Sequence, residues 1–409
     1  MNEKKILFII LESESASGIC VKKVSAYLCQ HGYHVDLLVQ ECGIEHKEKT
    51  KYTTKYVQAK LFDRYSKNIK NPFLKKTFEY AYSFQVALTS LVMWPMNSPL
   101  YAIKLSRLIT SLYEKEHYDI IIPVYTQIEP MVAAFNLKKK YNNILYIPYF
   151  LDSLSGGPVP RLLSKNKKIK MGLKWEKKLL SKADGIIAMK SSENHHKRYS
   201  SNFEYFKKMC FLDIPLYTDL HIEKKNNKSK ELIITYIGTL PMQIRNPMWG
   251  LKLLDEISNI KVKMVGPIPN SDEYVEFCKN KPYIQLVGAV KYEDTLDYIQ
   301  ESDVLLNFGN NISEMVPSKI FEYISSKKPI LSFSPNRDDP SIGYLQKYPY
   351  ACTIFKDMDR KLAITNMLEF LSNIDNIDQS INIDEQFYLN TPEAFRKYIE
   401  KVIKDCGND

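Results

Sequence analysis

Short apolar runs alternate with longer amphipathic segments along the first half of the chain. Residues 5–10 form an apolar run, a polar loop follows over 11–20, and a helix is predicted over 21–30 before a second strand at 33–39. This pattern predicts a strand–helix–strand unit with parallel strands that are buried on both faces. Further strands are expected at 119–124, 144–151, 183–189 and 209–214, and helices at 72–115 (with a break between Pro95 and Pro99), 129–141 and 161–180.

The alternation restarts behind a polar, turn-rich segment at 223–230, which is the best linker candidate. Strands are expected at 232–237, 261–265, 284–286, 303–309 and 330–333, with helices at 248–257, 271–279 and 292–301 between them. Two such runs imply an α/β chain with two doubly wound, Rossmann-like domains facing a central cleft, with ligands at the carboxyl ends of the strands. We place these domains at 1–222 and 231–385.

A helix is also expected at the C-terminus, over 391–409. Thr391 is suited to be its N-cap, and Pro392 fits its first position because a proline there loses no helical hydrogen bond. We expect this helix to pack back on the N-terminal domain.

The stretch from Glu314 to Glu322 carries the strongest chemical signal. It lies between two predicted strands, and Pro317 suits the first turn of a helix that runs through Glu322. The start of such a helix presents free N–H groups and the positive end of its dipole, which favour an anion such as a phosphate. Two carboxylates around a phosphate-binding helix start suggest a nucleotide-sugar site, with a carboxylate bonding to ribose or sugar hydroxyls.

Charge is unevenly distributed along the 409 residues. Residues 1–220 hold 34 Lys and Arg against 20 Asp and Glu, whereas the whole chain holds 57 against 47. The basic half could face an acidic substrate, an anionic membrane or nucleic acid, or the chain could simply be rich in lysine. The segment 161–180 could dock on an anionic membrane or be an ordinary helix with one solvated face.

The cysteines and the apolar runs indicate a cytoplasmic protein. Seven scattered cysteines without a Cys-x-x-Cys pair favour reduced thiols over a disulfide framework or a zinc site. The N-terminal apolar run is too short for a signal peptide, and the apolar region 81–96 is too short to span a bilayer.

Several motifs in the C-terminal half together resemble the donor domain of GT-B-fold glycosyltransferases. They are most similar to glycosyltransferase family 4 and its capsule and exopolysaccharide relatives. The residues that carry the resemblance span about 232–335 in the family's order: Gly238-Thr239-Leu, Arg245-Asn-Pro, the run 303–309, Glu314-x7-Glu322 and Lys328-Pro-Ile. The N-terminal half resembles the family only in its layout of strands and helices, as expected of a half that handles varied acceptors.

The resemblance implies a role for each matching residue. Gly238 and Thr239 would approach the donor diphosphate, which Arg245 would neutralise. Pro317, Ser318 and Lys319, at the helix start, would hold the distal phosphate, and Glu322 would bind the ribose. Glu314 would lie against the donor sugar at the reacting carbon, with retention of anomeric configuration. The family commonly has an arginine directly after the glycine, where this chain has Thr239.

The resemblance also frames the substrates. It implies a nucleotide-diphosphate sugar as donor, with UDP as the default nucleotide. The acceptor would be a saccharide or lipid-linked saccharide of cell-envelope, capsule or exopolysaccharide synthesis, handled on the inner face of the plasma membrane. No metal or other cofactor and no nucleic-acid partner are expected. Asp357-Met-Asp359, which could hold a cation, fits a solvated turn better.

In the N-terminal half, candidate residues have structural readings beside the functional ones. Asp152 follows the expected strand 144–151 and could be a catalytic base or acceptor ligand, or form an Asx turn before Ser153. Ser17 and Gly18 could approach the acceptor or the donor phosphate, or make a turn. His195 and His196 resemble a metal-binding or acid–base pair, but neighbours on a helix point apart, so we interpret them as a solvated helix start.

Two other functions remain open at this stage. A nucleotide-sugar 2-epimerase of the same fold would need several acid and base side chains in the cleft, and no such cluster stands out in the sequence. A non-catalytic, basic nucleic-acid-binding or scaffold protein would use the charge of the first half, but no aromatic-basic motif of a known RNA module is present.

Overall fold

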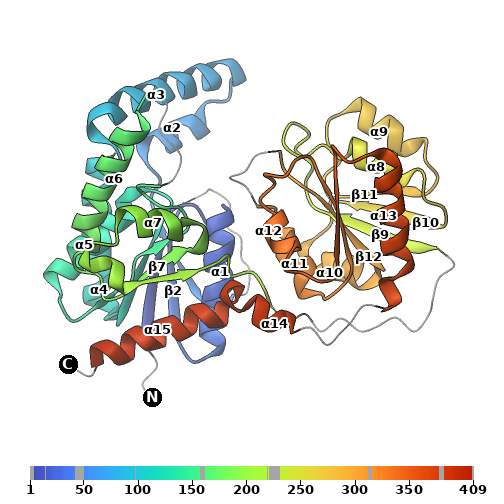
Figure 1. The fold of residues 1–409 in the computed structure, drawn as a ribbon. Helices are drawn as coiled ribbons and strands as arrows, with labels where there is room; N and C mark the ends of the chain where they lie inside the picture. Colours follow the sequence, from blue (N-terminus) through green and yellow to red (C-terminus); the bar gives the residue numbers. More distant parts are fainter. Residues whose placement is uncertain are drawn as a thin grey trace. The chain divides into compact units, whose positions relative to one another are not determined.

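The structure is a computed structural model, which describes residues 4–13, 15–41, 50–96, 98–156, 162–218, 220, 231–311, 316–376 and 382–407. The chain divides into two compact units, which we call unit 1 (1–215 with 389–409) and unit 2 (216–388) (Figure 1). The predicted linker 223–230 and the candidate Glu314 lie outside the described residues. Each unit is built on its own parallel sheet.

Unit 1 contains a parallel sheet whose central strands are buried on both faces. Its strands are β1 (Lys5–Ile9), β2 (His34–Gln40), β3 (Thr53–Val57), β4 (Ile120–Tyr125), β5 (Leu145–Tyr146), β6 (Tyr149–Phe150), β7 (Ile186–Met189) and β8 (Met209–Leu212). They run in the order β3–β2–β1–β4–β6–β7–β8, with β5 beside β4. The order reverses direction between β1 and β4, as it does in doubly wound folds.

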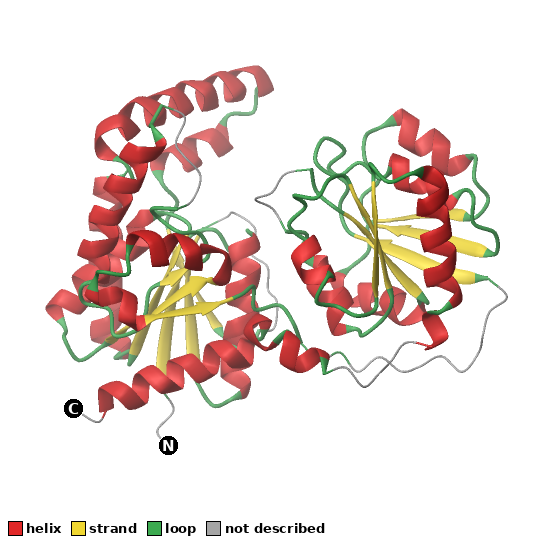
Figure 2. Cartoon of the chain, viewed as in Figure 1, coloured by secondary structure: helices red, strands yellow, loops and turns green. Residues whose placement is uncertain are grey.

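Helices cover both faces of this sheet (Figure 2). The helices of unit 1 are α1 (Ala16–Gln30), α2 (Leu61–Asn68), α3 (Pro72–Met93), α4 (Pro99–Glu116), α5 (Ile128–Lys140), α6 (Lys165–Leu180), α7 (Glu193–Tyr199) and α15 (Pro392–Gly407), with 3-10 turns at Lys190–Ser192 and Glu204–Lys208. Side chains alternate along β1: Leu7 and Ile9 enter the core under α4, α5 and α6, whereas Ile6 and Phe8 enter the core under α1 and α15. This period of two explains why β1 reads as one continuous apolar run.

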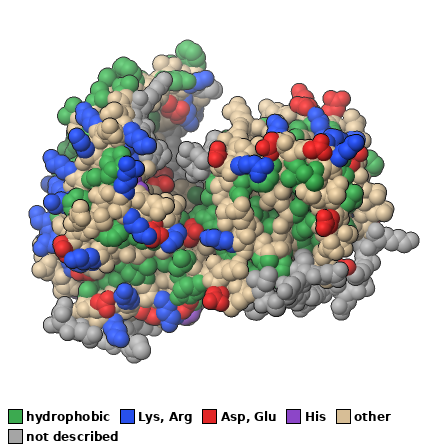
Figure 3. All heavy atoms as spheres, in the orientation of Figure 1, with side chains coloured by type: hydrophobic (Ala, Val, Ile, Leu, Met, Phe, Trp, Pro, Cys, Tyr) green, Lys and Arg blue, Asp and Glu red, His purple; other side chains and the backbone are tan. Residues whose placement is uncertain are grey.

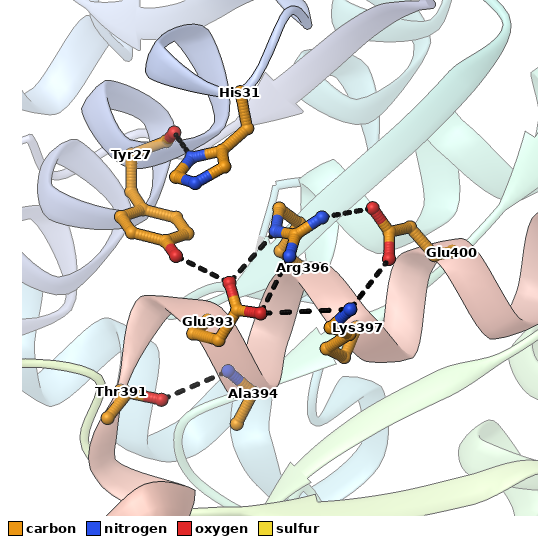
Figure 4. Close-up of polar contacts among 8 residues, drawn as sticks. All are labelled: Tyr27, His31, Thr391, Glu393, Ala394, Arg396, Lys397 and Glu400. Atoms are coloured by element: carbon orange, nitrogen blue, oxygen red, sulfur yellow. Dashed lines mark hydrogen bonds and ion pairs between the residues drawn. The ribbon is translucent and has the colours of Figure 1, made fainter. Parts of the chain in front are cut away.

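Helix α15 is the last element of the chain and packs on unit 1 beside α1 (Figures 1 and 4). Thr391 Oγ1 accepts a hydrogen bond of 3.0 Å from the Ala394 N–H, as expected of an N-cap. The Phe395 ring lies 5.1 Å from that of Tyr149 on β6, centroid to centroid. Glu393 accepts a hydrogen bond from Tyr27 of α1 and two from Arg396, at 2.9 and 2.6 Å. The end of the chain therefore completes one face of unit 1.

Unit 2 has a second parallel sheet with strands β9 (Leu232–Ile237), β10 (Ile260–Val265), β11 (Ile284–Gly288), β12 (Val304–Phe308), β13 (Ile330–Ser334) and β14 (Ala351–Phe355). Its helices are α8 (Met248–Leu254), α9 (Asp272–Lys279), α10 (Tyr292–Glu301), α11 (Lys319–Ser325), α12 (Ile342–Leu345), α13 (Arg360–Ser372) and α14 (Ile383–Gln386), with a 3-10 turn at Ile374–Asn376. A further 3-10 turn, Tyr388–Asn390, crosses the boundary to unit 1. The strand order is β11–β10–β9–β12–β13–β14. Counted from β9, this is the Rossmann order 3-2-1-4-5-6.

The structure corrects the predicted elements at several places. The strand expected at 144–151 is two short strands, β5 and β6, because Pro148 lies between them and has no N–H for the ladder. Helix α1 begins at Ala16, five residues earlier than predicted, because Ser15 caps it: the Ser15 Oγ accepts from the Gly18 N–H at 3.2 Å. Strands β3 and β14 and helix α13 were not predicted.

Candidate functional site

The carboxyl ends of β9 and β12 mark the place in unit 2 where a ligand is expected. The chain leaves β9 toward one edge of the sheet and returns through β12 to build the other half. The start of β12 pairs with the middle of β9, Val304 with Ile234 and Leu305 with Thr235, and the pairing ends there, so the carboxyl ends of the two strands separate. Open α/β sheets bind ligands at such a reversal point. The loops after β9 and β12 are therefore the natural walls of a site.

Glycines let the backbone turn sharply at the ends of adjacent strands. Gly238 follows β9 with a φ of 149°, and Gly266 follows β10 with a φ of 142°, both in a region that side chains disfavour. A Cβ on Gly266 would stand only 2.0 Å from the carbonyl oxygen of Gly238. Gly238 was predicted from the sequence, whereas Gly266 was missed because its partner belongs to another strand.

Arg245 is the positioned cation of this loop. Its Nε donates to the Oδ1 of Asn310 at 2.9 Å, and its Nη1 donates to the Tyr236 hydroxyl at 3.2 Å and to the Thr239 carbonyl at 3.1 Å. Asn310 is fully buried, and Arg245 is half-buried. No carboxylate among the described residues forms an ion pair with Arg245. Fixed by neutral acceptors alone, the guanidinium keeps its full charge for an anionic ligand.

Hydrogen bonds join this loop to the loop after β12 and to α11. The Asn311 N–H donates to the Ile244 carbonyl at 2.9 Å, and its side-chain amide donates to the Gln243 carbonyl at 2.8 Å. From α11, the buried Tyr323 hydroxyl accepts from the Ile237 N–H at 2.8 Å, at the last position of β9. Thr239 contributes its carbonyl to these contacts. These hydrogen bonds hold the three segments together.

Helix α11 starts later than the sequence suggested. It begins at Lys319, so Pro317 lies before the N-cap residue Ser318, and Glu322 lies in the first turn. The N–H groups of Ile320 and Phe321 already donate to carbonyls three residues back, at 3.1 and 3.2 Å. These two amides are therefore not available to a phosphate. The Nζ of Lys319 donates to the Oε2 of Glu322 at 2.6 Å.

In unit 1, Asp152 follows β6 and is exposed. The protein packed around its carboxyl raises the pKa of Asp152, and the charge of Lys168 opposes that effect. The turn that follows is closed by Ser153, whose Oγ accepts from the Gly156 N–H at 2.9 Å. The turn predicted for Asp152 is thus closed by the side chain of its neighbour Ser153.

Behind Asp152 lies a buried polar cluster that the sequence did not reveal. The Ser155 N–H donates to Glu176 at 2.8 Å, the Nζ of Lys168 donates to the Ser155 carbonyl at 3.1 Å, and the Ser155 Oγ lies 2.8 Å from the Nε2 of His195. Burial raises the pKa of Glu176 to about 7 and lowers the pKa of Lys168 to about 8, while their mutual attraction opposes both shifts. Such perturbed groups mark candidate functional sites.

The histidine pair differs from the prediction in one respect. His196 is buried, not solvated, and burial lowers its pKa to about 4. The two rings do diverge: His195 faces Ser155, and the Nδ1 of His196 lies 3.3 Å from the Ser200 hydroxyl. Unit 1 therefore brings several acid and base side chains close together, which the sequence did not indicate.

Ser17 and Gly18 belong to the first turn of α1 and not to the loop before it. A Cβ on Gly18 would lie 2.0 Å from the Ser13 carbonyl oxygen, so the glycine is explained by the packing of the loop on the helix. Their predicted contact with a ligand stays a prediction.

The candidate cation motif has a structural explanation. The Asp359 carboxylate caps α13 by accepting from the N–H groups of Lys361 and Leu362 at 3.0 and 3.1 Å. Asp357 lies 3.7 Å from Arg337. Among the described residues, no group of three or more His, Cys, Asp and Glu could hold a metal ion.

No protein-family model and no curated protein matches the sequence. Solved structures do match it in fold. A glycosyltransferase from Rickettsia africae is 14% identical with a TM-score of 0.64, and each chain is covered completely. HepE from Anabaena in complex with UDP and glucose is 11% identical with a TM-score of 0.61, covering 98% of this chain and 100% of HepE.

The chain has the GT-B fold. A protein described as a putative UDP-N-acetylglucosamine 2-epimerase, from Listeria monocytogenes, also matches at 10% identity and a TM-score of 0.52, over 95% of this chain and 94% of that chain. Likeness at such identity establishes the fold and leaves the chemistry open.

Unit 2 brings three of the predicted residues together. Gly238, Thr239 and Arg245 meet at the reversal point of unit 2. The residues that sequence reasoning missed there are Asn310, Tyr236 and Tyr323, which hold Arg245 and α11 in place. Asn310 directly follows the predicted strand 303–309, and Tyr323 directly follows the predicted site residue Glu322. Position next to a predicted element is the only sequence feature that could have indicated them.

Proposed function

We propose that the chain is a glycosyltransferase that moves a sugar from a nucleotide-diphosphate sugar, with UDP as the expected nucleotide, to an acceptor hydroxyl. One observation carries the proposal: an arginine without a carboxylate partner among the described residues is fixed at the strand reversal of a Rossmann-like unit. A diphosphate fits this cation because guanidinium can bond to two phosphate oxygens at once. The leaving diphosphate would be stabilised by the same charge during transfer.

The other donor contacts follow from the positions of the residues in unit 2. Ser318 and Lys319 would contact the distal phosphate, and Glu322 would exchange its bond to Lys319 for the ribose hydroxyls. Gly238 would let the diphosphate approach the backbone. Glu314 stays a prediction from the family resemblance, as do retention of configuration and hexosyl transfer.

The acceptor side of the proposal rests on unit 1. A carboxylate with a raised pKa, such as Asp152, is suited to accept the proton of an acceptor hydroxyl. A saccharide or lipid-linked saccharide of envelope, capsule or exopolysaccharide synthesis is the proposed acceptor class, and the excess of basic residues in 1–220 favours a place at an anionic membrane surface. None of the described helices combines the length and apolar character needed to cross a bilayer.

The second candidate is a nucleotide-sugar 2-epimerase, favoured by the buried cluster of Glu176, Lys168 and His195. The two activities are separated by incubating the protein with UDP-sugars and following UDP and sugar products by NMR. Transfer predicts UDP release that requires an added acceptor and a new glycosidic bond. Conversion of the UDP-sugar to its 2-epimer without acceptor would overturn transfer in favour of epimerisation.

A further inference from the structure

Helix α3 has an apolar face that nothing in the described structure covers. Its exposed hydrophobic side chains recur at intervals of seven, four, four and four residues: Phe73, Tyr80, Phe84, Leu88 and Val92, each between 47% and 81% exposed. This spacing places them on one side of the helix. We call these five side chains the α3 face. It carries no charge, because the charged residues of α3 are Lys75, Lys76 and Glu79.

The opposite side of α3 already packs against protein. The ring of Phe62 on α2 stacks on Tyr82, with centroids 3.5 Å apart, and on Phe78, at 5.1 Å. Glu79 accepts a hydrogen bond of 2.9 Å from Ser66 of α2. A helix that is apolar on both sides is normally buried on both sides. A contiguous exposed apolar patch on a protein surface usually marks an interaction site.

Positive charge adjoins the C-terminal end of the α3 face. The Nζ of Lys167 on α6 donates to the Leu91 carbonyl of α3 at 2.8 Å, and Lys168 stands over the Trp94 ring, 5.8 Å from its centroid. Helix α6 contains seven lysines, and its one carboxylate, Glu176, is buried. We call the exposed residues Lys165, Lys170 and Lys174 the α6 lysines.

The apolar residues of α6 itself point elsewhere. Met171 and Trp175 pack against the core of unit 1, so α6 offers charge to solvent and little apolar surface. Figure 3 shows hydrophobic side chains at the end of unit 1 formed by α3 and Lys or Arg side chains beside them. An apolar strip and a lysine strip thus lie next to one another on two different helices.

We propose that the α3 face and the α6 lysines seat the protein on an anionic lipid bilayer, with α3 lying in the plane of the interface. Aromatic and aliphatic side chains enter the region between headgroups and acyl chains, and lysines contact acidic headgroups. This proposal rests on residues of α3 and α6 and does not depend on the proposed donor site of unit 2. A second copy of the chain fits less well, because a symmetric contact would bring two lysine strips together.

Vesicle flotation of the full chain tests the proposal. Phosphatidylcholine vesicles with about 30% phosphatidylglycerol are compared with pure phosphatidylcholine, at about 0.1 M and about 0.5 M salt. We expect flotation with the anionic vesicles, weakened at high salt. A double variant of the α3 face, Phe84→Ser with Leu88→Ser, should lower the bound fraction about tenfold.

Matched controls use exposed residues of unit 2. Leu362→Ser with Leu368→Ser replaces two leucines that are 52% and 49% exposed and should leave flotation unchanged. Lys170→Gln with Lys174→Gln should remove the preference for anionic vesicles, whereas Lys279→Gln with Lys347→Gln should keep it. All variants change exposed side chains, so thermal unfolding should match the parent.

Four results would each overturn the proposal. The first is a parent chain that stays unbound to anionic vesicles at low salt, and the second is an α3 variant that floats as well as its control. The third is a dimer, detected by sedimentation, that the α3 variant dissociates while the parent binds no vesicles. The fourth is a parent chain that binds single-stranded RNA through the α3 face but does not bind vesicles, which would assign the surface to nucleic-acid bases instead.

Discussion

At the scale of single residues, the site is organised by what holds Arg245. The sequence indicated Gly238, Thr239 and Arg245 because glycine after a strand and a nearby cation form a local pattern. It did not indicate Asn310, because the bond from Arg245 joins loops 65 residues apart and depends on β9 lying beside β12. Local periodicity does not determine the order of strands in a sheet. The residues that hold Arg245 in place could therefore not be predicted from the sequence.

Glu322 provides the prediction at this scale. If the carboxylate accepts the ribose hydroxyls, Glu322→Ala should raise the donor KM about tenfold or more with a smaller change in kcat. Steady-state kinetics over a range of UDP-sugar concentrations measures both constants. Lys319→Met is the companion variant, because it removes the partner of Glu322 and the proposed contact with the distal phosphate but keeps the ribose ligand. An unchanged donor KM in Glu322→Ala would remove this residue from the site.

At the scale of elements, the central strands were predictable, as were the edge strands β8 and β11, whereas the edge strands β3 and β14 were not. Residues of β12 and β13 are buried on both faces and read as continuous apolar runs. Strands β3 and β14 lie at sheet edges and are largely half-buried or exposed, so their sequences show no such run. The start of α1 was missed for a different reason: Ser and Gly are typical of loops, and only the packing against Ser13 shows why they stand in a helix.

Gly18 tests that explanation. Gly18→Ala places a methyl group about 2.0 Å from the Ser13 carbonyl oxygen, so the loop or the helix must move. We expect a loss of about 1–3 kcal/mol in the free energy of unfolding. Gly343→Ala is the matched control, since a Cβ there meets nothing within 4 Å, and it should change stability by less than about 0.5 kcal/mol. Denaturant unfolding of both variants measures the difference; equal stabilities would contradict the steric account.

At the scale of the whole molecule, the end of the chain returns to complete unit 1. Glu393 of α15 bonds to Arg396 and to Tyr27 of α1, and the hydrogen bonds from Arg396 are the main cause that lowers the pKa of Glu393 to about 2 (Figure 4). The sequence predicted this helix and its cap from Thr391 and Pro392. The contact with α1 depends on the sheet order and could not be predicted from local pattern.

The lowered pKa makes the contribution of Glu393 depend on pH. A carboxyl with a depressed pKa stabilises the fold fully above its ordinary value of 4.5, and this contribution disappears as the pH falls toward 2. Glu393→Gln should therefore cost about 1 kcal/mol near neutral pH, because the pair is partly exposed, and less at about pH 3. Thermal unfolding of parent and variant across this range measures it. A difference that stays constant with pH would show that the ion pair is not its source.

The central claim, a nucleotide-sugar site built around Arg245, is tested most directly by calorimetric titration of the full chain with UDP. Arg245→Gln is compared with Arg337→Gln, an exposed arginine of the same unit. We expect the parent and Arg337→Gln to bind UDP with equal affinity. Arg245→Gln should bind UDP about tenfold to a hundredfold more weakly, which is the loss expected for one charge-assisted hydrogen-bonding group. UDP binding that is unaffected by Arg245→Gln would contradict a nucleotide-sugar site built around Arg245.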